Sequence, residues 1–305
     1  MKKITLLVAV LALGLFFVSC NKEGQFNPKN KIDRVYSSSS YKSESNYNGY
    51  WETESIDNTP KHLSEIWNWD GKLLKSISYY DSDGELSYTE TYGYESKRLA
   101  TISTGSSDRW NLNYEKGKLS SMEYYEGTEK VCSYEFMHDN GKISEVRLTE
   151  FGGKKSATAK FPVNALRFFI PSANTENMMK AMAKINERHT TKDVYTDSIK
   201  LEWDGKNVSK VTYVDGAYTS TYEYTYDEKL NPYYGLFDIE EVGFTEMLSK
   251  NNVTRYVNRE DDYYEEQNYV YTYDGKIPTM QTHSYTHTYD YNRYTYSYTT
   301  YYEYK

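Results

Sequence analysis

His283 and His287 are the residues near the C-terminus whose types most resemble a metal-binding pair. They lie in a stretch that alternates Tyr with Thr, Ser and His, which is typical of a β-strand, with Tyr285 between them on the same face. Four residues along a strand span about 13 Å. Zinc binds imidazole nitrogen at about 2 Å, so one ion cannot reach both rings. We therefore predict no metal site here.

Two acidic stretches have carboxylates that could contact calcium. The first, residues 260–266, contains Glu260, Asp261, Asp262, Glu265 and Glu266, and its spacing matches no calcium-binding loop. The second, residues 81–85, reads Asp-Ser-Asp-Gly-Glu and is typical of a hairpin turn. We interpret both as solvated turns. The sequence has no nucleophile elbow, phosphate-binding loop or zinc cluster, so it predicts no catalytic residue, metal or cofactor.

Cys20 has the clearest chemical assignment in the chain. It follows Lys2, Lys3 and an apolar run from Leu6 to Val18, which together have the pattern of a secretion signal rather than a membrane span. The ending Phe17-Val18-Ser19-Cys20 resembles a bacterial lipobox, although Phe stands where Leu is usual. This implies a signal peptide over 1–19, lipidation of Cys20 and a membrane partner reached through the lipid. The alternative is an ordinary signal peptide that is cleaved near Ser19.

Two further residues are candidates for modification or reaction. Asp197-Ser198-Ile199 resembles the acceptor that some Gram-negative bacteria use for O-glycosylation, which makes Ser198 a candidate site. Cys132 lies in a strand-like segment without a nearby His or Asn pattern that would activate it. We predict a buried thiol, and no internal disulfide, since Cys20 is assigned to lipid.

The elements that must position these residues are set by a short repeated phrase: aromatic, Asp, Gly, Lys, then apolar residues. The clearest copies begin at Trp69, Trp203 and Tyr273, and looser copies begin at Tyr94, Tyr114, Asp139 and Tyr226. Asp-Gly suits the two central positions of a type I′ hairpin turn. After the turn, apolar residues are three apart rather than two, so we predict a β-bulge there.

The phrase recurs at intervals that indicate a repeat architecture. Its Lys residues are separated by 97 − 72 = 25, 118 − 97 = 21, 142 − 118 = 24 and 229 − 206 = 23 positions. This fits two strands of about eight residues and two turns per repeat. A degenerate copy at Lys250-Asn251-Asn252-Val253 falls between Lys229 and Lys276. The interval 206 − 142 = 64 indicates an insertion.

The insertion, residues 151–200, differs in character from the repeats. Met178, Met182 and Ile185 recur at helical spacing after candidate N-caps, so we predict a helix over 172–188. We expect it to plug or cap the strand array, because a helix of about 15 residues is marginal alone in water. The competing arrangement is a lobe on the outside.

The rest of the chain fits one domain after a tether. Residues 20–34 are polar with Gly and Pro, and we interpret them as a lipidated Cys and a flexible tether. The repeat domain then covers 35–305, with Ser37 to Ser40 as either a loop or a frayed edge strand. Formal charge is −8, or about −8 − 2 = −10 without Lys2 and Lys3, which disfavours nucleic acid as a partner.

These repeats predict an all-β fold of about 14 to 18 antiparallel strands. The chain has 36 Tyr, and a single open sheet would expose its Tyr face, so we expect the meander to close into a barrel. The face opposite Tyr carries Thr, Ser, Glu and Lys rather than an apolar band, so we expect the barrel to lie in water.

The repeats resemble the YD repeats of the Rhs family, on residues such as Tyr226-Asp227-Glu228-Lys229-Leu230. The whole of 35–305 is similar to a family of Gram-negative lipoproteins of unknown function. That resemblance rests on the segments 67–73, 201–206 and 226–235, and it implies a porin-like barrel at the outer membrane or cell surface. It implies no activity.

Two hypotheses of function follow. The first is a non-catalytic binding or structural module, in which Tyr and Trp offer flat faces to a glycan or peptide. The second is a carbohydrate-active enzyme, such as a glycoside hydrolase with paired carboxylates in the barrel mouth.

Overall fold

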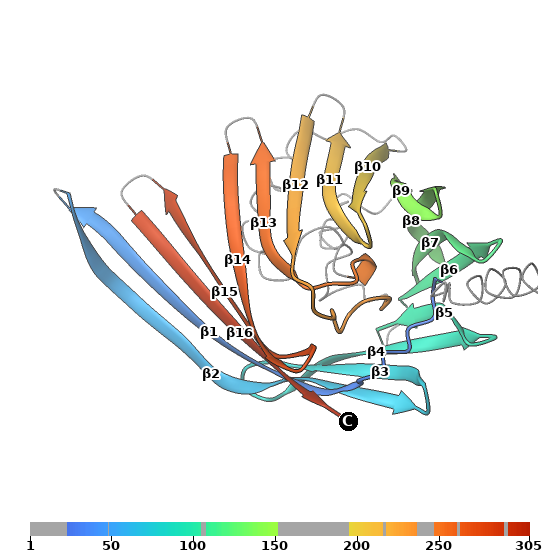
Figure 1. Cartoon of the computed structure of the whole chain (residues 1–305), viewed down its shortest axis with the longest axis horizontal. Coiled ribbons are helices and arrows are strands. Elements are labelled where there is room, and N and C mark those ends of the chain that lie inside the picture. Colours follow the sequence, from blue (N-terminus) through green and yellow to red (C-terminus); the bar gives the residue numbers. More distant parts are fainter. Residues whose placement is uncertain are drawn as a thin grey trace, which may run out of the picture.

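The chain forms a closed barrel of sixteen antiparallel strands (Figure 1). The computed structural model describes residues 23–47, 49–104, 108–151, 195–215, 218–236, 247–260, 263–289 and 292–305. Each strand pairs with the next along the sequence, and β1 pairs with β16 to close the ring. The predicted all-β meander and its closure are therefore confirmed.

The strands differ in length around the barrel, and the longest are those at and near the seam between β1 and β16. Their bounds are β1 Ile32–Tyr47, β2 Tyr50–Asp70, β3 Leu73–Tyr80, β4 Leu86–Glu95, β5 Arg98–Ser103, β6 Arg109–Glu115, β7 Lys118–Glu126, β8 Glu129–Asp139, β9 Lys142–Glu150, β10 Tyr195–Asp204, β11 Asn207–Asp215, β12 Tyr218–Tyr226, β13 Val253–Glu260, β14 Tyr263–Asp274, β15 Ile277–Tyr289 and β16 Asn292–Tyr304.

The repeated phrase forms the turns at one end of the barrel, which we call the packed end; the opposite end is the far end. The predicted type I′ turn is correct for the looser copies at Tyr94, Tyr114 and Asp139, as at Ser96 and Lys97, which both have positive φ. The copy at Tyr226 forms no hairpin turn, because β12 ends there and β13 begins only at Val253. The predicted turn type is wrong for Asp70-Gly71-Lys72-Leu73, whose two central residues are Gly and Lys. There only Gly71 has positive φ (56°), as in a type II′ turn, for which glycine is favoured at the first central position.

A β-bulge follows the turn, as the spacing of the apolar residues predicts. Trp69 pairs with Leu74 and Asn68 with Ser76, so Lys75 is the additional residue. The bulge restores the phase, and Leu74 and Ile77 are both fully buried. In four other repeats the bulged residue is Ser or Thr, and its hydroxyl donates to a carbonyl of the preceding strand (Ser120, Ser144, Thr254 and Thr279, at 3.0–3.2 Å).

The aromatic residue of five phrases, and Tyr271 and Tyr304 elsewhere, each link two strands that no turn joins at this end. The Trp69 indole N–H, for example, donates to the Ile32 carbonyl at 2.8 Å, which ties the end of β2 to the start of β1. Seven strand pairs carry such a bond, all at 2.6–2.9 Å: Trp69–Ile32, Tyr94–Leu74, Tyr114–Leu99, Trp203–Ile143, Tyr226–Val208, Tyr271–Val253 and Tyr304–Pro278. We call these bonds the aromatic links.

The pair formed by β7 and β8 is held by Glu23 instead. His138 occupies the aromatic position there, and its Nε2 lies 3.2 Å from the Glu23 carboxylate. The same carboxylate accepts the Leu119 backbone N–H at 2.6 Å and lies 3.3 Å from Lys118 Nζ. Burial alone would raise the pKa of Glu23, but the bonds from His138 and Leu119 and the nearby charges lower it overall.

The lysine of the phrase adds a second contact across the same strand pairs. Lys142 Nζ donates to the Gly205 carbonyl at 2.5 Å and lies 5.2 Å from the centre of the Trp203 ring. Lys31, Lys118 and Lys229 contact the carbonyls of Gly71, Gly141 and Gly275 in the same way. Aromatic and lysine therefore act together in joining neighbouring turns.

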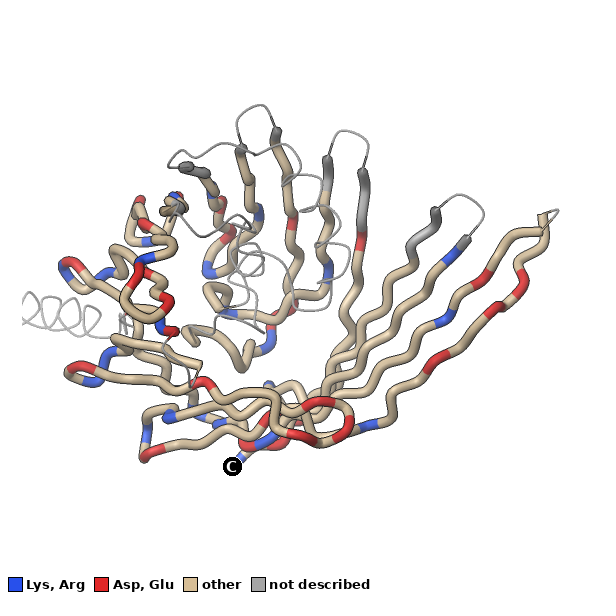
Figure 2. The backbone as a smooth tube through the Cα atoms, turned by 180° about the vertical axis from the view of Figure 1, so that it is seen from behind, with Lys and Arg blue, Asp and Glu red and all other residues tan. Residues whose placement is uncertain are grey.

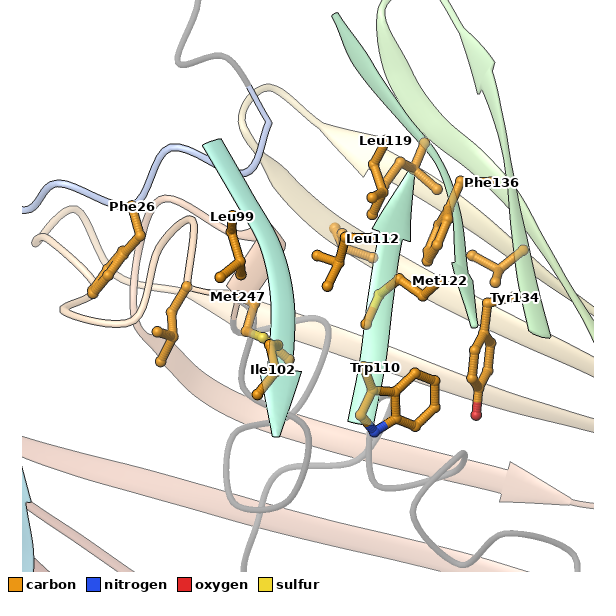
Figure 3. Close-up of a cluster of buried hydrophobic side chains, with 14 of the residues drawn as sticks. Phe26, Leu99, Ile102, Trp110, Leu112, Leu119, Met122, Tyr134, Phe136 and Met247 are labelled. Atoms are coloured by element: carbon orange, nitrogen blue, oxygen red, sulfur yellow. The ribbon is translucent and has the colours of Figure 1, made fainter. Parts of the chain in front are cut away.

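Buried side chains fill the barrel at the packed end (Figure 3). Residues on the strands, such as Leu99 and Met122, belong to one cluster with Phe26 of the N-terminal segment. Leu236 and Met247, from the connection between β12 and β13, belong to it as well. Among the described residues, these two segments thus supply buried side chains in addition to those of the strands. The helix expected over 172–188, with Met178, Met182 and Ile185, lies outside the described residues.

The structure shows the arrangement of two segments for which the sequence predicted something else or left alternatives open. Ser37 to Ser40 form neither a loop nor an edge, because they pair with β16 on one side and lie along β2 on the other. Residues 23–31, expected as part of a flexible tether, lie against the packed end instead. Phe26 is 5% exposed and contacts the Trp67 and Trp69 rings, which explains why this polar segment is held.

The outward face of the barrel is polar. Side chains there form hydroxyl pairs such as Thr282–Thr299 and ion pairs such as Lys130–Glu123 and Arg255–Glu266. Charges of both signs are spread over the turns and along the long strands (Figure 2). Within the described residues, none of the helical structure has the length and apolar character needed to cross a membrane.

We predict that Tyr94→Phe lowers the free energy of unfolding by about 1 kcal/mol, because it removes one aromatic link and leaves the Leu74 carbonyl without that donor. Denaturant unfolding would measure the change. The control is Tyr80→Phe on the same hairpin, where the described residues give the hydroxyl no partner; it should change stability little. Equal stability of both variants would show that the links do not hold the barrel.

Candidate functional site

The residues singled out by the sequence do not converge on one site. Cys20 lies outside the described residues. Ser198 lies on the outward face of β10 and donates a hydrogen bond to Glu145 at 3.2 Å. Cys132 is buried in β8, as predicted, and is not disulfide-bonded.

The acidic stretches and the histidine pair are likewise separate. Asp81 caps its own turn by accepting the backbone N–H groups of Asp83 and Glu85, which confirms a turn at 81–85. His283 is buried on the inner face of β15, and the side chain of His287 is not among those described. Across the described ranges, no three His, Cys, Asp or Glu side chains come together as a metal site.

One region of the inner surface stands out because it carries no charge. It lies on β14, β15, β16 and β1, on the face shared with buried Tyr269 and Tyr302. We call this region the uncharged wall; it consists of Val35, Ser37, Ser39, Tyr41, Ser43, Gln267, Tyr269, Tyr271, Gln281, His283, Tyr285, Tyr294, Tyr296, Tyr298, Thr300 and Tyr302.

On β1 and β16 the opposite face carries the charges. Glu44 accepts hydrogen bonds from Lys42 Nζ (2.7 Å) and Arg293 Nε (2.8 Å). The bond from Lys42 and the contact with Arg293 lower the pKa of Glu44. Arg293 also lies over the Trp51 ring, 4.5 Å from its centre. The strands therefore separate charged side chains from uncharged ones by face.

Rings on the uncharged wall stack on one another across the strands. His283 lies 5.1 Å from both Tyr269 and Tyr298, and Tyr285 and Tyr296 are stacked at 4.9 Å. These distances equal the spacing between strands, so the rings stand on the sheet with their faces against each other. The expectation that Tyr offers flat faces to a ligand is therefore wrong for these stacked rings. Ring edges and hydroxyls face the barrel interior instead.

Several polar groups of the wall are already hydrogen-bonded within it. The Tyr269 hydroxyl donates to Gln267 at 3.0 Å, and the Tyr302 hydroxyl donates to Gln281 at 2.9 Å. Tyr41 and Tyr294, nearer the far end, are only half-buried. The wall thus combines amides that are already hydrogen-bonded with more accessible phenols at Tyr41 and Tyr294.

His283 is the exception to this hydrogen bonding. Its side chain is 7% exposed, and its Nε2 has no hydrogen-bond partner. Burial lowers the pKa of His283 to about 4, so the ring is neutral at pH 7. A neutral imidazole between two Tyr rings gives the wall an unused polar atom without a charge.

Two carboxylates on the inner face, those of Glu65 and Glu90, have partners of their own. Glu65 accepts the Trp67 indole N–H at 2.6 Å, and Glu90, fully buried, accepts the Tyr92 hydroxyl at 2.7 Å. Each is thus engaged by an aromatic neighbour two residues along its own strand. This arrangement gives no particular support to paired carboxylates for glycoside hydrolysis.

Sequence reasoning missed both the wall and the segments that fill the packed end. The wall could have been found from alternation, because Tyr294, Tyr296 and Tyr298 share a face with no acidic or basic residue between them on that face. Glu23 had a fainter signal: His138 stands where other repeats have Tyr or Trp. No local pattern indicated that Leu236 and Met247 would be buried.

Comparison with known proteins supports the fold. No family model and no curated protein matches the sequence. A solved porin-like protein from Bacteroides uniformis is similar over 93% of this chain and 100% of its own, with 12% identity and a TM-score of 0.50. One from Bacteroides vulgatus covers 91% and 99%, with 11% identity and a TM-score of 0.45. The chain thus has a porin-like fold, as expected.

We predict that the buried His283 makes the barrel sensitive to acid. Its folded pKa, about 4, lies below the ordinary 6.5, so its contribution to stability is complete above pH 6.5 and is lost as pH falls toward 4. The loss should approach about 3 kcal/mol. His283→Phe keeps a ring between the two tyrosines and should remove this part of the pH dependence. Chemical unfolding at several pH values tests this; an unchanged acid profile in the variant would contradict it.

Proposed function

We propose that this protein is a lipid-anchored envelope protein that binds an uncharged, hydroxyl-rich ligand on the uncharged wall, without catalysis. The ligand class is a neutral glycan. The observation that carries the proposal is the separation of charge on β1 and β16, where Arg34, Lys42, Glu44, Arg293 and Glu303 all lie on the outward face.

The chemistry of the wall favours neutral hydroxyl groups over charged ones. An anionic ligand group placed there would lose its hydration without gaining an opposite charge. Sugar hydroxyls both donate and accept hydrogen bonds, as the half-buried phenols of Tyr41 and Tyr294 do. A peptide would need partners for its backbone as well, and it is the second ligand class to test.

An enzymatic role is the alternative. Because Glu65 and Glu90 are each held by an aromatic neighbour, a glycoside hydrolase mechanism has no specific observation in its favour. Incubating the protein with neutral oligosaccharides and analysing the products would reveal hydrolysis.

The proposed location follows from the sequence and the polar outer face. Lipid on Cys20 would hold the barrel at the outer membrane or cell surface of a Gram-negative bacterium, with the barrel itself in water. Ser198 is the proposed site of O-glycosylation. Its half-buried place on the outward face of β10 leaves the hydroxyl bonded to Glu145.

Cys20→Ser is expected to release the protein from the membrane fraction, because it removes the thiol that carries the lipid. Carbonate-washed membranes from the native host, with intact-mass measurement of the wild-type protein, provide the test. The same mass reports on Ser198. Retention of the variant in washed membranes, or a wild-type mass without acyl chains, would contradict the anchor.

Tyr41→Ala should weaken glycan binding at least about tenfold, which corresponds to about 1.4 kcal/mol. Tyr36→Ala is the matched control, since Tyr36 lies on the outward face of the same strand and donates to Glu303. Binding is measured on an array of neutral oligosaccharides, acidic oligosaccharides and peptides. Selective binding to acidic glycans or to peptides, or equal effects of the two variants, would overturn the proposal.

A further inference from the structure

We infer that the packed end of the barrel faces the lipid bilayer, close to its surface, and that the far end points away from it. The inference rests on the lipid anchor of the proposed function, and it adds the orientation and stand-off of the barrel. The partner surface is the bilayer that carries the lipid.

Glu23 is fixed to the packed end. Its carboxylate joins His138 and Leu119 and thereby ties β8 to β7, at the position where the other pairs have an aromatic link. It is also paired with Lys118. Glu23 is therefore part of the ring of contacts at this end.

The residues that follow Glu23 also contact the packed end. The Gly24 carbonyl accepts the Leu99 backbone N–H at 2.8 Å. A Cβ on Gly24 would lie 2.1 Å from the Tyr114 hydroxyl, so the backbone approaches the barrel closely there. Phe26 packs on the Trp67 and Trp69 rings, and Lys31 contacts the Gly71 carbonyl. The segment crosses the packed end before β1 begins at Ile32.

The chain between Glu23 and the anchor is short. Cys20 precedes Glu23 by three residues, and three residues span at most about 11 Å. Acyl chains on Cys20 would thus keep Glu23 within about 11 Å of the depth at which that residue sits in the membrane surface. A tether of the predicted length, ending at 34, would have allowed any orientation.

The far end of the barrel is distant from the anchor. β1 runs from the packed end for sixteen residues, which corresponds to about 53 Å of strand. With a strand tilt of about 40°, it rises roughly 40 Å along the barrel axis. The far-end tip of the β1–β2 hairpin would then lie well outside the bilayer, and a ligand entering from the far end would come from the aqueous phase.

Fluorescence energy transfer from single introduced cysteines tests this orientation. Lys72→Cys, in the exposed turn after β2, marks the packed end, and Tyr50→Cys, 77% exposed at the start of β2, marks the far end. Full-length lipidated protein is labelled with a donor dye and bound to phosphatidylethanolamine–phosphatidylglycerol vesicles that contain a headgroup-labelled acceptor lipid. Cys132 is buried and can remain.

Transfer should be severalfold more efficient from position 72 than from position 50. A twenty-residue Gly-Ser insertion between Asn21 and Lys22 is the control and should reduce the difference, because such a linker spans roughly 25 Å on average. Equal transfer from both positions in acylated protein would overturn the orientation while leaving the anchor intact. An intact mass without acyl chains would overturn both, and mass measurement distinguishes the two failures.

Discussion

The barrel depends on joining strands that no turn joins. Turns connect β2 to β3, β4 to β5 and so on at the packed end, but β1 and β2, or β3 and β4, meet there only through contacts. The aromatic links supply one hydrogen bond for each of seven such pairs, and Glu23 supplies it for β7 and β8. Because the links reach from one hairpin to the next around the ring, including the β1–β2 pair beside the seam, they oppose fraying of the barrel end. The repeated phrase thus forms a turn and also bonds one hairpin to the next.

This arrangement divides the barrel into two parts. Apolar side chains, the β12–β13 connection and the N-terminal segment fill the packed end. Toward the far end, the inner face of β15, β16 and β1 carries stacked rings and hydroxyls and no charge. Cross-strand stacking holds these rings by their faces, so that a ligand meets pre-arranged polar edges. The parts of the strands that stabilise the barrel therefore differ from the parts that form the candidate binding surface.

Much of the fold could be predicted from sequence, because turn chemistry and alternation are local. The strand number, the bulge implied by Leu74 and Ile77, and the turn at 81–85 followed from spacing alone. The links were not predictable in this way. They join residues that local periodicity does not connect, as Glu23 and His138 show. The segment around Phe26 is otherwise polar, so the sequence predicted a tether there. The wall was not predicted for a related reason. The sequence led us to expect Tyr rings that offer their flat faces to a ligand, whereas rings stacked at the strand spacing use those faces against one another.

The central claim is that the packed end holds the barrel and leaves the far-end wall available to a neutral glycan. Residue-resolved amide hydrogen exchange, with and without the neutral oligosaccharide that binds best in the array, tests it most directly. The account predicts the slowest exchange around the whole packed end, at amides such as those of Leu99 and Leu119. It also predicts added protection from the glycan only in the far-end halves of β15, β16 and β1. Uniform exchange along the strands, or glycan protection at the packed end, would contradict it.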